Sequence, residues 1–264
     1  MPLSAEVVIL LDAIDKHQPM VAMLAPSFPI VFPYPRIIGK LKRLGFARVV
    51  EVSRGAAETN RQLLELLKKN PHSRYITNPC PTAVRFIRTG YPHLRQYLAP
   101  TDSPMAACAK IVAREFPEHK IFFIGPCVLK KMEASQDYPE LKITALTYKE
   151  LQQVLKLKKI KTDKTDFMQG FDLIGYHTRL YPISGGLSQS SGLNDLLTDE
   201  EYDVVSGPVL MKQALDNFEK NKKLRVLDLL NCDGGCISGP GISSRLSLDQ
   251  RRLKIIAHWA KQVK

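Results

Sequence analysis

The segment RVLDLLNCDGGCISGPG, residues 225–241, decides the fold class. It starts with an apolar run of strand length, and Cys232 follows that run almost at once. Cys232 and Cys236 then enclose Asp-Gly-Gly, and two more glycines follow. Glycine is tolerated where a backbone bends sharply or comes close to a bulky group. The segment therefore predicts a buried strand that ends in a ligand-holding loop, although two thiols alone are too few for a metal site.

The same pattern occurs twice more in the chain. A predicted strand at 74–78 precedes Cys80, and another at 120–124 precedes Cys127. Amphipathic helical segments lie between the strands, which is typical of α/β proteins. Open α/β sheets present ligand sites at the carboxyl ends of their strands. We therefore expect four cysteines from distant loops to meet at one site.

Further elements follow from the same periodicity. We expect strands at 20–24 and 47–53 and helices at 36–45, 56–70, 105–116 and 246–263, with Gly45 ending the first helix. Cys108 shares a helical face with Met105, Ile111 and Val112, which predicts a buried structural thiol and not a ligand.

Composition indicates a soluble globular protein. The chain has 264 residues, of which 44% are hydrophobic and 24% charged, enough for one large domain or two lobes. No run of 18 apolar residues occurs, so we expect neither a membrane span nor a signal peptide, and a cytoplasmic location. Five cysteines at wide spacing differ from a secreted disulfide framework and are expected to be reduced.

The chain is strongly basic. Lys and Arg number 38 against 26 Asp and Glu, a net charge of +12 that favours an acidic partner. The basic runs at 37–43 and 155–164 have no RNP-type aromatic motif, zinc-finger spacing or repeat beside them. We interpret them as solvated surface and do not expect nucleic-acid binding. The functional alternative is a docking surface for a small acidic electron carrier.

Four converging thiols leave three possibilities open. Zinc accepts four cysteines, but its usual signature is a close pair on each side, and only one pair here is close. A 4Fe-4S cluster also takes four cysteines and tolerates scattered ligands. The third possibility is no metal at all. Glycines beside the ligands favour the cluster, because its sulfurs accept hydrogen bonds from nearby backbone N–H groups.

The three cysteine loops, TNPCP (77–81), GPCVLKKMEA (125–134) and LNCDGGCISGPG (230–241), resemble the signature loops of the catalytic domain of iron-only (FeFe) hydrogenases. The resemblance spans nearly the whole chain, with LAPSF (24–28), LGFARVVEVSRGA (44–56) and YPISGG (181–186) similar to further segments of that family.

The resemblance implies an H-cluster, a 4Fe-4S cubane joined through one cysteine sulfur to a two-iron unit that carries CO, cyanide and a dithiol bridge. Carried over position by position, the cubane ligands would be Cys80, Cys127, Cys232 and Cys236. Cys236 would also bridge to the two-iron unit.

Other site residues follow from the resemblance too. Lys130 would donate a charge-assisted hydrogen bond to a cyanide, with Glu133 orienting its neighbours and Ser184 beside them. The residues around the two-iron unit would be Ala25, Pro26, Ser27, Gly125, Pro126, Gly185 and Gly186. Without the flanking cysteine, Lys130 and Glu133 would be interpreted as surface charges and Ser27 as a helix cap.

The chain departs from the family at three places. Fast hydrogen-producing members carry a second cysteine in the first loop, which passes protons, where this chain has Pro79. Gly125 and Leu230 stand where those members have methionines. These forms resemble the divergent, sensory-type branch. We therefore expect slow reversible hydrogen chemistry or H2 sensing, with protons and H2 as substrates.

Two alternatives stay open. One is a cubane-only 4Fe-4S protein in electron transfer, signalling or cluster delivery, without hydrogenase activity. The other is a zinc-containing or metal-free binding module. The family's ferredoxin-like cysteine segment is absent from this sequence. The chain is therefore either a minimal form that docks an acidic ferredoxin or other iron-sulfur electron carrier, or a piece of a longer protein.

The predicted architecture is two α/β lobes, residues 1–104 and 105–264. Each lobe is expected to contain a small mixed sheet flanked by helices, with the iron-sulfur site in the cleft between them.

Overall fold

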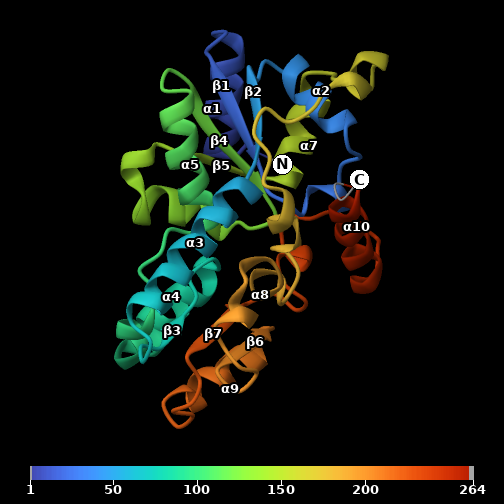
Figure 1. Cartoon of the computed structure of the whole chain (residues 1–264). Coiled ribbons are helices and arrows are strands. Elements are labelled where there is room, and N and C mark those ends of the chain that lie inside the picture. Colours follow the sequence, from blue (N-terminus) through green and yellow to red (C-terminus); the bar gives the residue numbers. More distant parts are fainter. Residues whose placement is uncertain (1, 262–264) are drawn as a thin grey trace.

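Residues 2–261 contain seven strands in two separate sheets, and helices pack on both sheets (Figure 1). The structure is a computed structural model that describes residues 2–261. The strands are β1 (Met20–Leu24), β2 (Arg48–Glu51), β3 (Tyr75–Ile76), β4 (Lys120–Gly125), β5 (Thr144–Thr147), β6 (Tyr202–Ser206) and β7 (Val226–Leu230).

The α-helices account for most of the remaining regular structure. They are α1 (Ala5–Asp15), α2 (Arg36–Arg43), α3 (Ser53–Lys69), α4 (Pro81–Gly90), α5 (Pro104–Glu115), α6 (Leu129–Met132), α7 (Tyr148–Leu157), α8 (Gly186–Ser191), α9 (Pro208–Phe218) and α10 (Leu248–Ala260). The expected helix at 246–263 corresponds to α10, and its residues 262–263 lie outside the described part of the chain.

The larger sheet, sheet A, has the strand order β2-β1-β4-β5, and the smaller sheet, sheet B, has the order β3-β7-β6. Every pairing in both sheets is parallel. The α/β fold with two small sheets is therefore confirmed, but the expectation of mixed sheets is wrong. Helical segments separate the sequential neighbours: α2 separates β1 from β2, α6 separates β4 from β5, and α9 separates β6 from β7. Such crossovers return the chain in the same direction.

The sheets do not divide the chain at residue 104. Sheet A takes β1 and β2 from before that residue and β4 and β5 from after it, whereas sheet B combines β3 with β6 and β7. The long helix α3 runs from the sheet A part toward the sheet B part (Figure 1). Each sheet is thus assembled from segments that are distant in sequence.

Local sequence signals set the helix ends. The Ser103 hydroxyl accepts a hydrogen bond from the backbone N–H of Ala106 and caps α5. Thr147 and Glu150 form a capping box that starts α7 directly after β5. Gly45 follows α2 with φ +113°, the left-handed conformation that glycine adopts at low cost after a helix.

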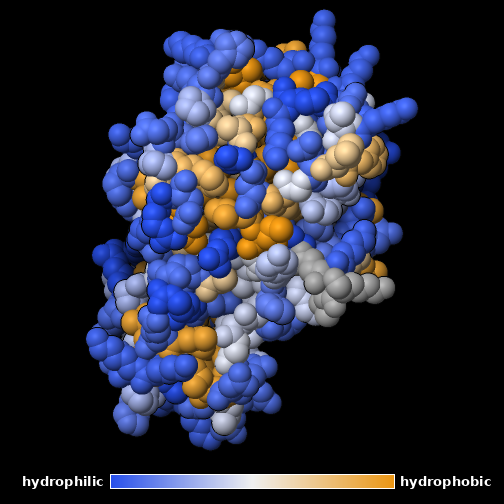
Figure 2. Space-filling model, turned by 45° about the horizontal axis from the view of Figure 1, so that its top comes forward, coloured by the Kyte–Doolittle hydropathy of each residue, from blue (hydrophilic) through white to orange (hydrophobic). Residues whose placement is uncertain are grey.

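The core is continuous under sheet A, whose strand β1 is buried at all five positions. Sheet B packs on a second, smaller cluster with α4 and α9. Polar side chains cover most of the face in Figure 2, with apolar patches in its middle and lower parts. Within residues 2–261, no helix is both long enough and apolar enough to cross a membrane.

A buried ion pair joins the end of β2 to the segment that leads into the 181–186 loop. The Arg179 guanidinium lies 2.7 Å from one Glu51 carboxylate oxygen and donates to the other at 2.9 Å. Both side chains are almost fully buried, with 4% and 1% exposure. The backbone N–H of Gly175 also donates to Glu51 at 3.1 Å. This pair fixes the loop's position against sheet A.

We expect Arg179→Met to lower the free energy of unfolding by about 3–5 kcal/mol, because it leaves the Glu51 charge buried without its partner. Urea unfolding of the metal-free protein measures this change. Arg61→Met is the matched control, since Arg61 pairs with Glu58 and Glu65 on the exposed surface of α3 and should barely move the midpoint. Equal midpoints for the two variants would contradict the role given to Arg179.

Candidate functional site

Strand register brings the predicted loops to the same place. In sheet A, Leu24 pairs with Ile124 and Gly125 pairs with Thr147, so three loops begin at one edge. In sheet B, Ile76 pairs with Leu227, so the chain leaves β3 and β7 toward Cys80 and Cys232 on the same side. Parallel strands end together, and their carboxyl ends form the site.

All four predicted ligand cysteines line a single cavity between these loops. Cys80 is buried, and Cys127, Cys232 and Cys236 are partly exposed. The cavity wall is mainly apolar. Its lining residues are Ala25, Pro26, Ser27, Val52, Ala56, Pro79, Cys80, Pro81, Thr82, Pro104, Met105, Phe123, Pro126, Cys127, Lys130, Tyr181, Pro182, Leu187, Asp228, Leu230, Asn231, Cys232, Cys236 and Gly239.

Close backbone contacts hold the third cysteine loop against its neighbours. Gly235 has φ +99°, and a Cβ there would lie 2.6 Å from the Pro182 carbonyl oxygen. A Cβ on Gly239 would lie 2.5 Å from the Pro126 carbonyl oxygen. The backbone N–H of Gly241 donates to that same oxygen at 2.7 Å. The glycines therefore allow the loop that carries Cys232 and Cys236 to pack on the 181–186 loop and on the loop that carries Cys127.

The environment of the thiols disfavours free thiolates. Burial raises the pKa of Cys127, while the nearby Lys130 charge acts against that shift. Burial and the neighbouring cysteines raise the pKa of Cys232 to about 11 and that of Cys236 well above its usual value. Because metals bind thiolates, a bound metal must displace these protons and add positive charge to that of Lys130.

Lys130 is the cation of the cavity wall. Its side chain is 10% exposed, and its ammonium group donates to Glu133 at 2.6 Å and to the Pro79 carbonyl oxygen at 3.3 Å. Glu133 lies outside the lining and also accepts a hydrogen bond from the Ser103 hydroxyl. Lys131 points elsewhere and pairs with Glu6 and Glu150. A lysine that is buried and paired in this way is held in place by the fold.

Ser27 also lines the cavity and is fully buried, and its hydroxyl is 2.8 Å from the Tyr148 hydroxyl. Tyr148 donates its only hydroxyl proton to the Ala25 carbonyl oxygen at 2.8 Å. Ser27 must therefore donate to Tyr148, which leaves only lone pairs of the serine hydroxyl for the cavity. Burial raises the pKa of Tyr148 well above its usual value, so this arrangement persists across the physiological pH range.

Sequence reasoning missed three buried polar residues at the cavity. Tyr148 orients Ser27, as described above, and Asp228 and Tyr181 are in the lining. Asp228 accepts a hydrogen bond from Thr77 at 2.8 Å, and burial raises its pKa to about 6 while that hydrogen bond opposes the shift. An acidic residue inside the apolar run at 225–230 was the available signal for Asp228. Nothing in the local sequence marks Tyr148.

Several predicted residues lie near the cavity but not in its lining. These are Gly125, Glu133, Ser184, Gly185 and Gly186. The backbone N–H of Ser184 donates to the Gly234 carbonyl oxygen at 3.0 Å, which ties the 181–186 loop to the third cysteine loop. Cys108 is fully buried against the Glu51 backbone, away from the cavity, as expected of a structural thiol.

The donor set fits an iron-sulfur cluster better than one metal ion. Four thiols share the cavity, but no group of three or more His, Cys, Asp or Glu side chains among residues 2–261 is arranged to hold a single ion. A cubane binds each thiolate at a different iron, so its ligands stand further apart than those of one tetrahedral ion. The apolar wall and the packed glycine backbone also suit a bulky inorganic group.

Known proteins resemble this chain in sequence and in fold. A curated relative, Iron hydrogenase 1 of Clostridium pasteurianum, is 23% identical over 259 residues, covering 78% of this chain and 45% of the relative. The chain thus spans about half the length of that relative. Two solved structures of [FeFe]-hydrogenase HydA1 from Chlamydomonas reinhardtii, a variant and an apo variant, match the fold. Their TM-scores are 0.71 and 0.72 at 16% and 17% identity, and each match covers 96% of this chain and 88% of HydA1.

The model of the family described as "Iron only hydrogenase large subunit, C-terminal domain" matches residues 18–240, which include all four predicted ligand cysteines. The chain belongs to the iron-only hydrogenase large-subunit family.

Proposed function

We propose that the cavity binds an H-cluster and that the protein interconverts protons, electrons and H2 slowly, or senses H2. The observation that carries this proposal is the meeting of four cysteine thiols with the buried Lys130 ammonium in one apolar cavity. A structural zinc site held by four thiolates would not account for the buried Lys130 ammonium in the cavity wall. When bound, the cluster would supply redox-active iron that exchanges electrons and reacts with H2.

The protein's own residues would hold the cluster, form hydrogen bonds to it and exclude water. Cys80, Cys127, Cys232 and Cys236 would hold the cubane, with Cys236 also joining the two-iron unit. Lys130 would donate a charge-assisted hydrogen bond to a cyanide ligand, held in place by Glu133. Ser27, with its proton committed to Tyr148, would act only as a hydrogen-bond acceptor there. The apolar wall would exclude bulk water.

Pro79 limits the rate in this proposal. It is buried in the cavity wall directly before Cys80 and has no exchangeable side-chain proton. Loss of a positioned acid or base typically costs about 10²–10⁴ in rate. This feature also favours a second candidate function, a cubane-only protein in electron transfer, signalling or cluster delivery. An acidic ferredoxin or similar carrier in the cytoplasm would supply electrons in both cases, and the net charge of +12 supports such a partner.

Iron and sulfide binding tests the ligand set. After anaerobic reconstitution, we expect four iron and four sulfide per chain in the wild type, about the content of one cubane. Ala at Cys80, Cys127 or Cys232 should lower that content and destabilise the cluster. Cys108→Ala is the control and should keep the full content, because Cys108 lies outside the cavity. Equal loss in all variants would contradict the assignment.

Infrared spectroscopy separates the two candidate functions. We expect sharp CO and cyanide bands after the reconstituted protein is loaded with a synthetic two-iron precursor and desalted. In Lys130→Met a cyanide band should shift, because the charged donor is lost, whereas Lys131→Met should leave the bands unchanged. If the wild type never shows such bands, the protein is a cubane-only relative and the hydrogenase proposal fails.

Restoring a thiol at position 79 tests the rate limit. We expect Pro79→Cys to raise the hydrogen evolution rate of the loaded protein by roughly 10²-fold, since it adds a proton donor at the cavity wall. Pro79→Ala removes the same ring without adding a donor and should leave the rate low. A similar gain in both variants would show that the proline ring, and not the missing proton, is limiting.

A further inference from the structure

A second cavity lies behind the Lys130–Glu133 pair. It has a volume of about 70 Å³, which exceeds the ~10–15 Å³ that a cavity needs, on the same measure, to hold one water molecule. Its wall contains several polar side chains, so water would find hydrogen-bond partners there. Its lining residues are Asn78, Pro81, Val84, Arg88, Leu98, Ala99, Ser103, Glu133, Asp137 and Tyr138.

The second cavity adjoins an open groove on the surface. Five of its residues also line that wider groove, which Arg95, Pro100 and Thr101 complete. Asn78 stands at the boundary, where its amide oxygen accepts from the Thr101 hydroxyl at 2.8 Å. Water can therefore reach the second cavity from solvent.

The Lys130–Glu133 pair spans the wall between the two cavities. Lys130 lines the cysteine cavity, Glu133 lines the second cavity, and Pro81 borders both. The ammonium and carboxylate groups are 2.6 Å apart. Glu133 also begins a π-helical segment, Glu133–Asp137, a distortion that is frequent at functional sites.

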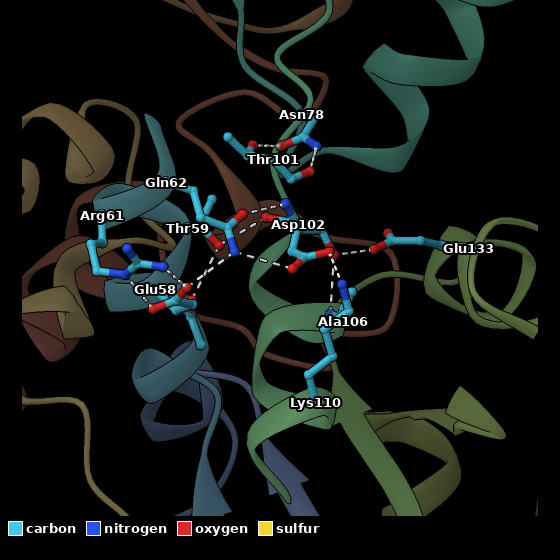
Figure 3. A network of polar contacts seen from close by, with 12 residues as sticks. Glu58, Thr59, Arg61, Gln62, Asn78, Thr101, Asp102, Ala106, Lys110 and Glu133 are labelled. Atoms are coloured by element: carbon cyan, nitrogen blue, oxygen red, sulfur yellow. Dashed lines mark hydrogen bonds and ion pairs between the residues drawn. The ribbon is translucent and has the colours of Figure 1, made fainter. Parts of the chain in front are cut away.

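The second hydrogen-bond contact of Glu133, with the Ser103 hydroxyl, does not offer a path for protons to the surface. The Ser103 hydroxyl donates to Glu133 and accepts from the Ala106 backbone N–H, whereas the neighbouring Asp102 belongs to a separate set of contacts with Gln62 (Figure 3). Gln62 accepts from the Asp102 backbone at 2.7 Å and donates to Asp102 and Glu58, both at 3.1 Å. Its amide is fully committed and has no titratable proton. The second cavity is the route that remains.

We propose that the second cavity is a hydrated proton-entry site and that Glu133 passes protons from it, along Lys130, into the cysteine cavity. The inference rests on the proposed function, because the cysteine cavity needs protons only if reduction occurs there. On this route, Glu133 and the second cavity supply the proton that Pro79 cannot donate.

The step balances without any redox partner. A water in the second cavity gives a proton to one Glu133 oxygen, and the hydroxide that remains takes a proton from the solvent through the groove. The Lys130 ammonium has no free lone pair, so it first releases an N–H proton into the cysteine cavity and becomes a neutral amine. The O–H bond of Glu133 then breaks, and its proton joins Lys130 Nζ and restores the ammonium. One proton moves from solvent to the cysteine cavity, Glu133 returns to its starting form, and no electron moves.

The charges that face Glu133 are already paired. Asp137 is held by Arg85 at 3.2 Å and Arg88 at 2.6 Å, on the side of α4. Asp102, next to Ser103, is held by Lys110 at 2.6 Å on α5. Burial raises the pKa of Tyr138 to about 12, which keeps that side chain neutral. Among residues 2–261, Glu133 is thus the carboxylate of the second cavity whose only ion pair is with the buried Lys130.

Time-resolved infrared spectroscopy after flash reduction of the reconstituted cubane tests this route. Reduction adds negative charge to the cysteine cavity and should draw a proton to Glu133, seen as a transient carboxylic-acid C=O band. We expect that band in the wild type and its absence in Glu133→Gln. In Ala99→Leu, which fills the second cavity, the band should form roughly 10²-fold more slowly. Val84→Leu fills the same cavity from α4 and should act in the same direction.

Glu150→Gln is the matched control, because Glu150 pairs with the adjacent Lys131 at 2.6 Å but borders neither cavity. It should leave the band and its rate unchanged. A cubane that forms normally without the band in the wild type would overturn the proposal. So would an unchanged rate in both cavity-filling variants, once urea unfolding shows that they fold. Failure to bind iron and sulfide at all would remove the proposed function together with this inference.

Discussion

The parallel alignment of strands is the constraint on which the rest of the structure depends. Cys80, Cys127 and the Cys232–Cys236 pair are far apart in sequence, and each follows the carboxyl end of a different strand. If β4 or β7 ran in the opposite direction, its cysteine loop would lie at the far end of its sheet. Crossover helices enforce the common direction, and buried side chains on every strand of sheet A hold the register.

Much of the fold was predictable because apolar runs and turn residues report burial locally. The strands at 20–24 and 120–124 and the cysteine loops after β3, β4 and β7 lie where the sequence places them. Strand direction and the sharing of each sheet across residue 104 depend on pairing between distant segments, which local patterns do not encode. For the same reason Tyr148 was missed, since its contacts with Ser27 and Ala25 cross more than a hundred residues.

Lys130 is buried although its local sequence is typical of an exposed surface. A Lys-Lys pair is usually solvated, and Lys131 does remain at the edge with Glu6 and Glu150. One residue earlier, the helix α6 turns Lys130 inward to the cysteine cavity and to Glu133. Removal of either member would leave a buried charge, which is costly. The pair therefore links the chemistry of the cavity to the stability of its wall.

The most direct test of an H-cluster in this cavity is the number and position of iron atoms in a crystal of the fully loaded protein, measured by anomalous diffraction at the iron edge. We predict four iron sites among Cys80, Cys127, Cys232 and Cys236, and two more beyond Cys236 toward Lys130 and Ser27. A single metal ion held by the four thiols, or iron bound away from them, would contradict the assignment of the cavity.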